Sequence, residues 1–367
     1  MIKYVKTSYK QKDCIFLLKE VEMEFTKVEE KERLIQLGLV HYSETVSKEL
    51  PPTDKYLKLF FKLTHAYKQR LAREVLYLSK IIENKFKNDV CIISLARAGA
   101  PIGVLVNRAI NEYSGIKSRH YSISIIRDKG IDFNALDHII FDLGFNPSSI
   151  IFLDGWTAKG TITHELKKSI SEYNESRNVE VSSDLYVISD IGSTADFFAT
   201  KDDYTIPSAL MNSTVSGLIS RSILNENLSN NDFHGCVSYD YLAPFDYSNW
   251  FIDEVSYCFS LEDYKISLDK HRETNPSEFR SYIYKIMKEF SVTNINRVKP
   301  GIAESTRVML RRVPDVLIVR DTDDVNVSHL LQLADEKSIN VVVKGDMPMG
   351  ACALIKDVIN NEKNSNF

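Results

Sequence analysis

Three units of apolar strand, small-residue turn and helical pattern follow one another between residues 89 and 200. They are DVCIISLARAGAPIGVLVNRAI at 89–110, SSIIFLDGWTAKGTITHELKKSI at 148–170 and DLYVISDIGSTADFFAT at 184–200, and an alternating strand, SRHYSISIIRDKGID, lies at 118–132. Repetition of this unit predicts an α/β fold in which helices cover a parallel sheet. Ligands of such sheets bind at the carboxyl ends of the strands, which is where the small-residue turns fall.

Changes in the pattern of apolar residues along the chain predict four segments. Residues 1–85 are expected to be mostly helical, because apolar residues in YLKLFFKLTHAYKQRLAREVLYLSKII recur at helical spacing. The parallel-sheet domain should cover 86–260, a helical connector 261–295, and a small α/β domain 296–367. The residues of the first long helix that we expect to face the core are Leu57, Phe60, Phe61, Leu71, Val75, Leu78 and Ile81.

Composition excludes several classes of protein. With 46 Lys and Arg against 50 Asp and Glu, the whole chain is no polycation, although a local basic patch can still bind nucleic acid. Five scattered cysteines without a CxxC pair argue against a disulfide framework and a zinc site. There is no apolar run of ~20 residues and no apolar core of a signal peptide at the start, so we expect a cytoplasmic protein without a membrane partner.

The turn of the second unit places a carboxylate next to a candidate phosphate cradle. In IIFLDGWTAKGTIT at 150–163, Asp154 ends an apolar strand, and a glycine-containing turn leads into the next helix. Backbone N–H groups at a helix N-terminus bind phosphate, and Thr157, Thr161 and Thr163 can add hydroxyl donors. Asp154 can accept hydrogen bonds from sugar hydroxyls or help to hold a phosphate-bound Mg²⁺. An ordinary βα turn capped by Asp and Thr explains the same residues equally well.

Further basic residues lie in the turns of the predicted sheet. Arg97, among the small residues of LARAGAPIG, can grip a pyrophosphate bidentately, and a surface ion pair is the alternative. Arg127 and Lys129 follow the alternating strand, where they can form a flexible basic loop over a phosphate or a solvated hairpin-like turn. All three are therefore candidate ligand-binding residues.

The segment IIFLDGWTAKGTIT is similar to the ribose-5-phosphate loop of type I phosphoribosyltransferases, and IISLARAGAPIGVLV at 92–106 resembles their pyrophosphate-binding loop. The resemblance implies a phosphoribosyltransferase-like fold and a Mg²⁺-assisted transferase acting on a phosphorylated ribose ligand. In that family two adjacent acids contact the ribose, whereas here Asp154 is followed by Gly155. Catalytic roles are implied for Asp154, Arg97 and Lys159, with Asp154 also near the metal through phosphate. The implied phosphate- and ribose-binding positions are Ala98, Gly99, Ala100, Thr157, Ala158, Lys159, Gly160 and Thr161.

Motifs spread over most of the chain carry a closer resemblance. They are HYSE at 41–44, LARAGAPIG at 95–103, FLDGWTAKGTI at 152–162, IPSALMNSTVSGLISR at 206–221 and FHGCVSYDYLAPFDYS at 233–248. These motifs resemble the StiP-type family, whose members occur with tellurite-resistance and stress-response genes and are often labelled cysteine proteases. The C-terminal GIAESTRVMLRRVPDVLIVR, SHLLQLADEKSINVVV and MGACALI resemble the Pelota-type RNA-binding domain. The resemblance implies a stress-response enzyme that makes or cleaves a nucleoside-like metabolite or acts on RNA.

The C-terminal domain carries a basic helical face. Arg307 and Arg311 lie four residues apart, Arg312 is adjacent, and Arg297 and Lys299 precede the helix. Such a face fits the RNA backbone, and a solvated basic surface is the alternative. We therefore expect RNA to be a partner of this domain.

Two other functions compete with the transferase. His234 and Cys236 lie two residues apart, on one side of a strand, and are the candidate dyad of a cysteine peptidase, although cysteines on apolar strands are more often core residues. A non-catalytic nucleotide or RNA sensor is the second competitor, because Gly155 replaces the second acid. We also expect the chain to form a homodimer.

Overall fold

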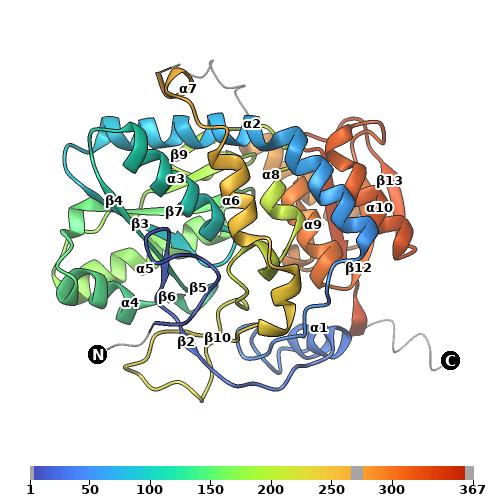
Figure 1. Cartoon of the computed structure of the whole chain (residues 1–367). Helices are drawn as coiled ribbons and strands as arrows, with labels where there is room; N and C mark the ends of the chain where they lie inside the picture. Colours follow the sequence, from blue (N-terminus) through green and yellow to red (C-terminus); the bar gives the residue numbers. More distant parts are fainter. Residues whose placement is uncertain (1–3, 266–275, 360–367) are drawn as a thin grey trace.

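The computed structural model describes residues 4–265 and 276–359. Within these residues it confirms a mixed α/β fold, built on a six-stranded sheet in the order β1-β4-β3-β7-β8-β9 with every neighbouring pair parallel (Figure 1). The parts of the predicted segments at 1–3, 266–275 and 360–367 lie outside the described residues. The strands of the sheet are β1 Ile15–Phe16, β4 Ser118–Ile123, β3 Val90–Leu95, β7 Ile150–Thr157, β8 Leu185–Asp190 and β9 Phe197–Thr200.

Helices cover both faces of this sheet, because successive residues of a strand point to opposite sides. In β3, Ile92 belongs to the core beneath α2, α3 and α6, whereas Cys91 and Ile93 belong to the core beneath α4 and α5. Every residue of β3 is buried, which explains its continuous apolar run in the sequence. The helices of this domain are α2 Asp54–Lys85, α3 Gly99–Tyr113, α4 Phe133–Asp137, α5 Thr161–Arg177 and α6 Ser248–Ser256.

The long helix α2 begins at a capping threonine. The hydroxyl oxygen of Thr53 accepts a hydrogen bond from the Tyr56 N–H at 3.2 Å, which satisfies one of the free donors of the first turn. Of the seven residues expected to face the core, five are buried, and Phe61 and Ile81 are partly buried against it. Spacing alone therefore identified the apolar face of α2.

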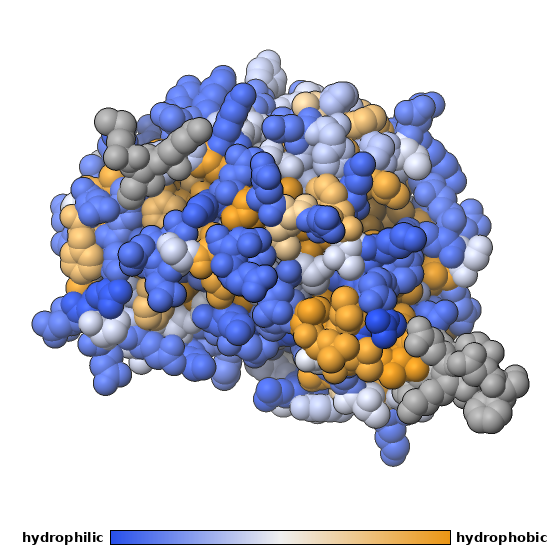
Figure 2. Space-filling view, turned by 90° about the horizontal axis from the view of Figure 1, so that it is seen from below, coloured by the Kyte–Doolittle hydropathy of each residue, from blue (hydrophilic) through white to orange (hydrophobic). Residues whose placement is uncertain are grey.

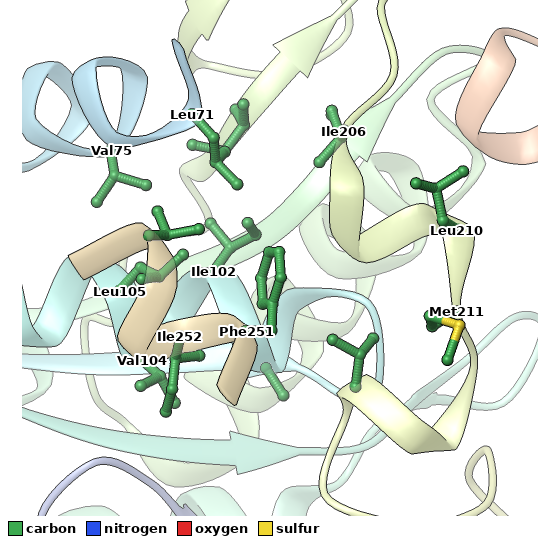
Figure 3. Close-up of a cluster of buried hydrophobic side chains, with 14 of the residues drawn as sticks. Leu71, Val75, Ile102, Val104, Leu105, Ile206, Leu210, Met211, Phe251 and Ile252 are labelled. Carbon is green, nitrogen blue, oxygen red and sulfur yellow. The ribbon is translucent and has the colours of Figure 1, made fainter. Parts of the chain in front are cut away.

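The core between α2, α3 and α6 is made of interlocking aliphatic side chains. Figure 3 shows Leu71 and Val75 of α2 above Ile102 and Leu105 of α3, with Phe251 of α6 beside them. All five side chains are fully buried. Because three helices share this core, it fixes α2 over the sheet.

The residues before α2 contain less helix than the sequence predicted. α1 spans Val28–Gln36, whereas β1 joins the edge of the main sheet and β2 (Lys19–Glu20) pairs in parallel with β10 (Gly235–Cys236). Both short strands pair with residues more than a hundred positions later in the chain, so no local spacing indicates them. Within the described residues 4–85, α-helix covers Val28–Gln36 and Asp54–Lys85, so residues 4–27 and 37–53 differ from the predicted mostly helical segment 1–85.

The surface beneath α1 carries an apolar patch. Figure 2, seen from below, shows a largely hydrophilic face with hydrophobic residues gathered where α1 lies in Figure 1. Just after α1, Leu37 and Leu39 are 42% and 66% exposed. The remaining short elements of the sheet domain and connector are β5 Ile125–Ile126, β6 Gly130–Ile131, α7 Leu261–Lys265 and α8 Pro276–Glu289.

The small C-terminal α/β domain is confirmed. Its sheet has the order β11-β14-β12-β13, with β12 and β13 parallel and β14 antiparallel to both neighbours. The helix, strand, helix and strand that the sequence indicates correspond to α9, β12, α10 and β13, whereas β11 and β14 were not predicted. The elements are β11 Val298–Pro300, α9 Ile302–Arg311, β12 Pro314–Val319, α10 Ser328–Glu336, β13 Asn340–Val343 and β14 Ala351–Ile355.

One carboxylate ties the two domains together. The side-chain oxygens of Asp203, which follows β9, accept hydrogen bonds from the backbone N–H groups of Ile302 at 2.9 Å and Gly350 at 2.8 Å. Burial raises the pKa of Asp203 to about 6, although these N–H groups act in the opposite direction. The first N–H of α9 would otherwise lack an acceptor, so Asp203 satisfies a backbone group of the other domain.

Replacing Asp203 with alanine should lower the free energy of unfolding by about 2–4 kcal/mol, because two backbone donors lose their acceptor. Urea unfolding at pH 7.5 measures the loss. Asp202→Ala is the matched control, since the exposed Asp202 pairs with Arg70 at 2.7 Å at the surface and should cost only about 0–1 kcal/mol. Equal losses in the two variants would contradict the role of Asp203.

Candidate functional site

A basic cleft of about 440 Å³ lies where the carboxyl edge of the six-stranded sheet meets the C-terminal domain. Its walls come from the turn after β7, the β5–β6 hairpin, the end of α1 together with Tyr42, and the β11–α9 region. Among the described residues that line it, the acids are Asp154 and Glu304. Its cationic side chains are Arg127, Lys159, Arg221, Arg297, Lys299, Arg307 and Arg312.

The strand β7 continues beyond Asp154, where the sequence predicted its end. Asp154 pairs with Val187 of β8, and the strand ends at Thr157, which pairs with Asp190. The Oδ1 atom of Asp154 accepts a hydrogen bond from the Gly155 N–H at 2.7 Å. Burial raises the pKa of Asp154 to about 7, with that N–H acting against the shift. Asp154 is therefore a half-buried acid within a strand, and its carboxyl group titrates near neutral pH.

The turn after β7 is held by the C-terminal domain. Gly160 adopts a left-handed conformation, with φ of +74°, where α5 begins. The ammonium of Lys159 donates to the backbone carbonyl oxygens of Ile295 at 2.8 Å and Val298 at 2.7 Å. Burial lowers the pKa of Lys159 to about 7, and the nearby Lys299 acts in the same direction. In this structure Lys159 joins the two domains, in the position for which the resemblance implied catalysis.

The turn after β8 packs tightly against the turn after β7. A Cβ atom on Gly192 would lie 1.7 Å from the carbonyl oxygen of Ala158, so a larger residue there must displace one of the turns. The hydroxyl of Thr157 lies 2.9 Å from that of Thr194, whereas Thr161 is exposed at the start of α5. The Thr157 hydroxyl, which was expected to bind phosphate, is therefore already hydrogen-bonded to Thr194.

An acid, an indole and a guanidinium form the wall on the side of α9. The Glu304 carboxylate accepts a hydrogen bond from the Trp156 indole N–H at 3.2 Å and lies 3.5 Å from the Arg307 guanidinium. Burial disfavours the charged form of Glu304, but Arg307 and Lys299 outweigh it and lower its pKa to about 2. The guanidinium of Arg307 lies over the Trp156 ring, 5.5 Å from its centroid. This wall therefore presents the flat indole ring of Trp156 next to the positively charged guanidinium of Arg307.

The predicted flexible basic loop is the turn of a short antiparallel hairpin, formed by β5 and β6. Arg127 donates to the Asn296 side-chain oxygen at 3.0 Å, and its guanidinium lies 5.3 Å from the centroid of the Tyr42 ring. Lys129 is exposed and is not among the residues that line the cleft. Of the two predicted residues, Arg127 reaches the cleft.

The residues of the first turn are split between two environments. Arg97 is buried and turns away from the cleft, with its guanidinium 2.7 Å from the Glu49 carboxylate. Ala98 lines the cleft, and Gly99 and Ala100 are buried at the start of α3. The structure therefore does not bring Arg97 together with Asp154 in one cavity.

The predicted basic face of α9 is also divided. Arg307 lines the cleft, whereas Arg311 donates a hydrogen bond to the side-chain oxygen of Asn212. Arg312 lines the cleft and makes two hydrogen bonds to the buried carboxylate of Glu32 in α1, at 2.5 and 2.9 Å. The three arginines thus contribute both to the cleft and to contacts with the N-terminal part of the chain.

The candidate dyad of His234 and Cys236 is not assembled. Cys236 is fully buried in β10, and burial raises the pKa of its thiol. The His234 ring hydrogen-bonds the Ser124 hydroxyl at 2.7 Å, and its backbone N–H donates to Asp132. The imidazole is therefore engaged elsewhere, and Cys236 is a core residue in this structure.

A different thiol lies against an imidazole. The sulfur of Cys14 is 3.8 Å from His120 Nε2, and His120 Nδ1 lies 2.9 Å from the Asp13 carbonyl oxygen. A carbonyl can only accept, so Nδ1 carries the proton and Nε2 faces the Cys14 thiol and the Ser94 hydroxyl, which is 2.8 Å away. Because 106 positions separate Cys14 from His120, no sequence spacing indicated this pair.

This pair is buried and uncharged. Cys14 and His120 are each 3% exposed. Burial raises the pKa of the Cys14 thiol well above its usual value and lowers the pKa of His120 to about 4. The thiol and the imidazole are therefore neutral around pH 7, and a reactive thiolate requires access of water or substrate to the pair.

The described part of the chain holds neither a cluster of metal-ligating side chains nor a helix that could span a membrane. Residues 4–265 and 276–359 contain no group of three or more His, Cys, Asp or Glu side chains that could hold a metal ion. In the same residues, every helix is too short or too polar to cross a bilayer. A Mg²⁺ ion at Asp154 would therefore depend on oxygen ligands from a bound phosphate.

Comparisons with known proteins match both parts of the chain. Residues 7–256 match the family described as "Tellurite-like stress resistance cysteine protease StiP", and residues 278–357 match the "PELOTA RNA binding domain". The chain is also similar to "Cysteine protease StiP" of Acinetobacter baylyi (strain ATCC 33305 / BD413 / ADP1). The two are 40% identical over 363 residues, which cover 95% of this chain and 94% of the relative.

These comparisons correct the function expected from the ribose-phosphate resemblance. The expected phosphoribosyltransferase is wrong, because the family and the relative are both named as cysteine proteases. The names agree better with the peptidase that the sequence left as an alternative. The StiP-type and Pelota-type resemblances are confirmed.

Asp154→Asn should stabilise the protein at pH 7–8, and the gain should shrink steadily as the pH falls toward 4. The carboxyl has a folded-state pKa of about 7, above its unfolded value of ~3.9, so its contribution is intact at low pH and is lost as the pH rises through 7. Thermal melts of both proteins between pH 4 and 8 measure this dependence. A difference in melting temperature that does not change with pH would show that Asp154 titrates normally.

Proposed function

Because the chain belongs to the StiP family of tellurite-like stress resistance proteins, we propose that it combines RNA binding with cysteine peptidase activity. RNA binding is the function that the geometry supports best. The observation that carries it is the cleft itself, where seven cationic side chains gather beside a Pelota-type domain; carboxylates pair with four of them, and the other three have no carboxylate partner among the described residues. Such an excess of positive charge attracts a phosphate backbone.

The cleft suits single-stranded RNA better than a duplex. Trp156 and Tyr42 supply aromatic rings, and arginine guanidinium groups lie over both. Unpaired bases stack on aromatic rings and on guanidinium planes, while phosphates meet the cations around them. A volume of about 440 Å³ accommodates a nucleotide or two and leaves no room for a double helix. We therefore expect binding with little preference among sequences.

Peptidase activity is the second candidate, and the contact between Cys14 and His120 favours it. The Asp13 carbonyl orients the ring so that Nε2 faces the thiol, which is the arrangement of a nucleophile, a base and an orienting group. The pair is covered in this conformation, so the segment around Cys14 must open for a peptide to reach it. The name of the relative supports this activity, and the buried pair supplies its residues.

Several finer expectations stay predictions. They concern the likeness of the sheet to phosphoribosyltransferases, a phosphorylated ribose ligand, Mg²⁺, a homodimer and a cytoplasmic location. A phosphate or nucleotide at the cleft would be compatible with RNA binding there, since RNA presents the same groups. None of these expectations is needed for the two proposed activities.

Arg127→Gln and Arg307→Gln should each weaken the binding of a single-stranded RNA about three- to tenfold, similarly for different sequences, because phosphates are read by charge. The slope of log affinity against log salt should fall by about 0.7 per lost contact. Fluorescence anisotropy with labelled oligonucleotides at several salt concentrations measures both effects.

The control for this experiment is Lys168→Gln, which removes one positive charge from the exposed face of α5, away from the cleft. It should leave both affinity and salt slope unchanged. If the control weakens binding as much as Arg307→Gln does, attraction is spread over the whole surface and the cleft is not the site.

Cys14→Ala should abolish cleavage of fluorescent casein, whereas Cys91→Ala should retain it. Both thiols are buried, but Cys91 belongs to the sheet core beneath α4 and α5 and no hydrogen bond joins it to an imidazole within the described residues. Melting temperatures of the two variants show whether either has lost its fold. Full cleavage by a folded Cys14→Ala protein, or absence of cleavage by the unmodified protein, would remove this pair from peptidase chemistry.

A further inference from the structure

A second, larger cavity lies between the N-terminal part of the chain and the C-terminal domain. Its volume is about 720 Å³, and its walls are α1, residues 46–56, residues 210–214, and parts of α9 and α10. Arg221 and Arg312 border both this cavity and the basic cleft. Asp154, Trp156 and Lys159 border the basic cleft but not this cavity. Neither proposed activity uses this cavity.

Cationic groups line this cavity at depth. Lys31 and Arg97 are buried, and Arg221, Arg311 and Arg312 are partly buried. Carboxylates neutralise two of these five groups, because Glu49 pairs with Arg97 at 2.7 Å and Glu32 pairs with Arg312 at 2.5 Å.

The other three cations have no carboxylate partner among the described residues. Arg221 donates to the backbone carbonyl of Thr45 at 2.5 Å, and Arg311 donates to the Asn212 side chain. The ammonium of Lys31 makes no hydrogen bond or ion pair with any described residue; Lys31 as a whole is 6% exposed, and its ammonium nitrogen keeps contact with solvent. Like charges held close together in partly desolvated surroundings repel one another, so an anion from outside the chain would stabilise this arrangement.

A second unsatisfied donor lies in the same cavity. The Nε–H of Arg97 is buried and has no hydrogen-bond acceptor in the described part of the chain. Arg97 itself is 4% exposed and borders the cavity. One buried donor in the turn after β3 and the unpaired ammonium of Lys31 in α1 therefore have unused hydrogen-bonding capacity at one cavity.

Burial, together with repulsion among these cations, lowers the pKa values of Lys31 and Arg311. Burial lowers the pKa of Lys31 to about 7, and Arg221, Arg312 and Arg311 lower it further, against the opposite effect of Glu32. Burial and Arg97 also lower the pKa of Arg311 well below its usual value. The other charged groups that border the cavity are Lys27, Glu29, Lys48, Glu49, Glu336 and Lys337.

The remaining wall is apolar. It includes Tyr56, Leu210, Met211, Leu310 and Leu333. A cavity with cations on one side and apolar side chains on the other suits a ligand with an anionic end and a less polar body. Guanidinium groups bind phosphate bidentately, and several of them together favour a doubly charged phosphate over a single carboxylate.

We propose that this cavity binds a small organic phosphate of about mononucleotide size, with its phosphate between Lys31, Arg221 and Arg311. The site lies in a different cavity from the RNA cleft, with Arg221 in the wall between them, and it does not depend on either proposed activity. The apolar wall contacts the organic part of the ligand. The phosphate supplies the negative charge that this group of cations lacks.

Isothermal titration with AMP tests the proposal, and adenosine is the matched control because it lacks the phosphate. We expect AMP to bind and adenosine to bind at least about tenfold more weakly. Lys31→Met should reduce AMP affinity about tenfold or more, without lowering the melting temperature of the free protein, because the ammonium has no partner to lose. Arg127→Gln, in the RNA cleft, should leave AMP affinity unchanged.

A proton measurement separates this site from ordinary surface binding. Because the pKa of Lys31 is about 7 in the free protein, a bound phosphate should raise it, and the protein should take up protons on binding AMP at pH 7.5. Titrations in two buffers with different ionisation enthalpies report this uptake, which Lys31→Met should abolish. AMP binding that is lost in Arg127→Gln and kept in Lys31→Met would overturn the proposal, as would equal affinity for AMP and adenosine or no binding at all.

Discussion

Two charged side chains, Lys159 and Asp203, attach the C-terminal domain to the carboxyl edge of the parallel sheet. Both side chains hydrogen-bond to backbone groups on the other side of the junction. The Lys159 ammonium donates to two carbonyl oxygens, and the Asp203 carboxylate accepts from two N–H groups. Both charges are largely desolvated at the junction, where these hydrogen bonds satisfy them together with backbone groups that would otherwise be buried without partners. The basic cleft exists because this junction holds Arg307 and Lys299 opposite the strand ends.

The sequence predicted those parts of the fold that depend on local spacing. The strand–turn–helix units, the apolar face of α2 and the α9–β12–α10–β13 order all follow from the periodicity of short segments. The elements it missed are held by distant partners. β1 and β2 are two residues long and gain their conformation from pairing with β4 and β10, while β14 lies antiparallel between β11 and β12. A pairing across a hundred residues leaves no local pattern.

For the candidate site, the structure groups the residues that the sequence singled out differently from what the sequence predicted. Asp154, Arg127 and Arg307 do meet in one cleft, because strand ends and the start of the second domain converge there. Arg97 and Arg311 border another cavity, and the thiol that lies against an imidazole is that of Cys14, whereas the sequence singled out Cys236. Which residues gather depends on the direction of each side chain, and a motif does not encode this when its partners lie elsewhere in the chain.

The 32-residue helix α2 has a mechanical consequence for the molecule. At ~1.5 Å per residue it is a rod of about 48 Å, and it contacts both domains: it packs on α3, while Tyr67 hydrogen-bonds Asn326 and Lys55 pairs with Glu336. A hinge motion between the domains would have to bend α2 or break its contacts with one of the two domains. In the described structure α2 does not line the cleft, so a slide or roll of one domain along α2 is the motion that would widen the cleft and keep the helix whole.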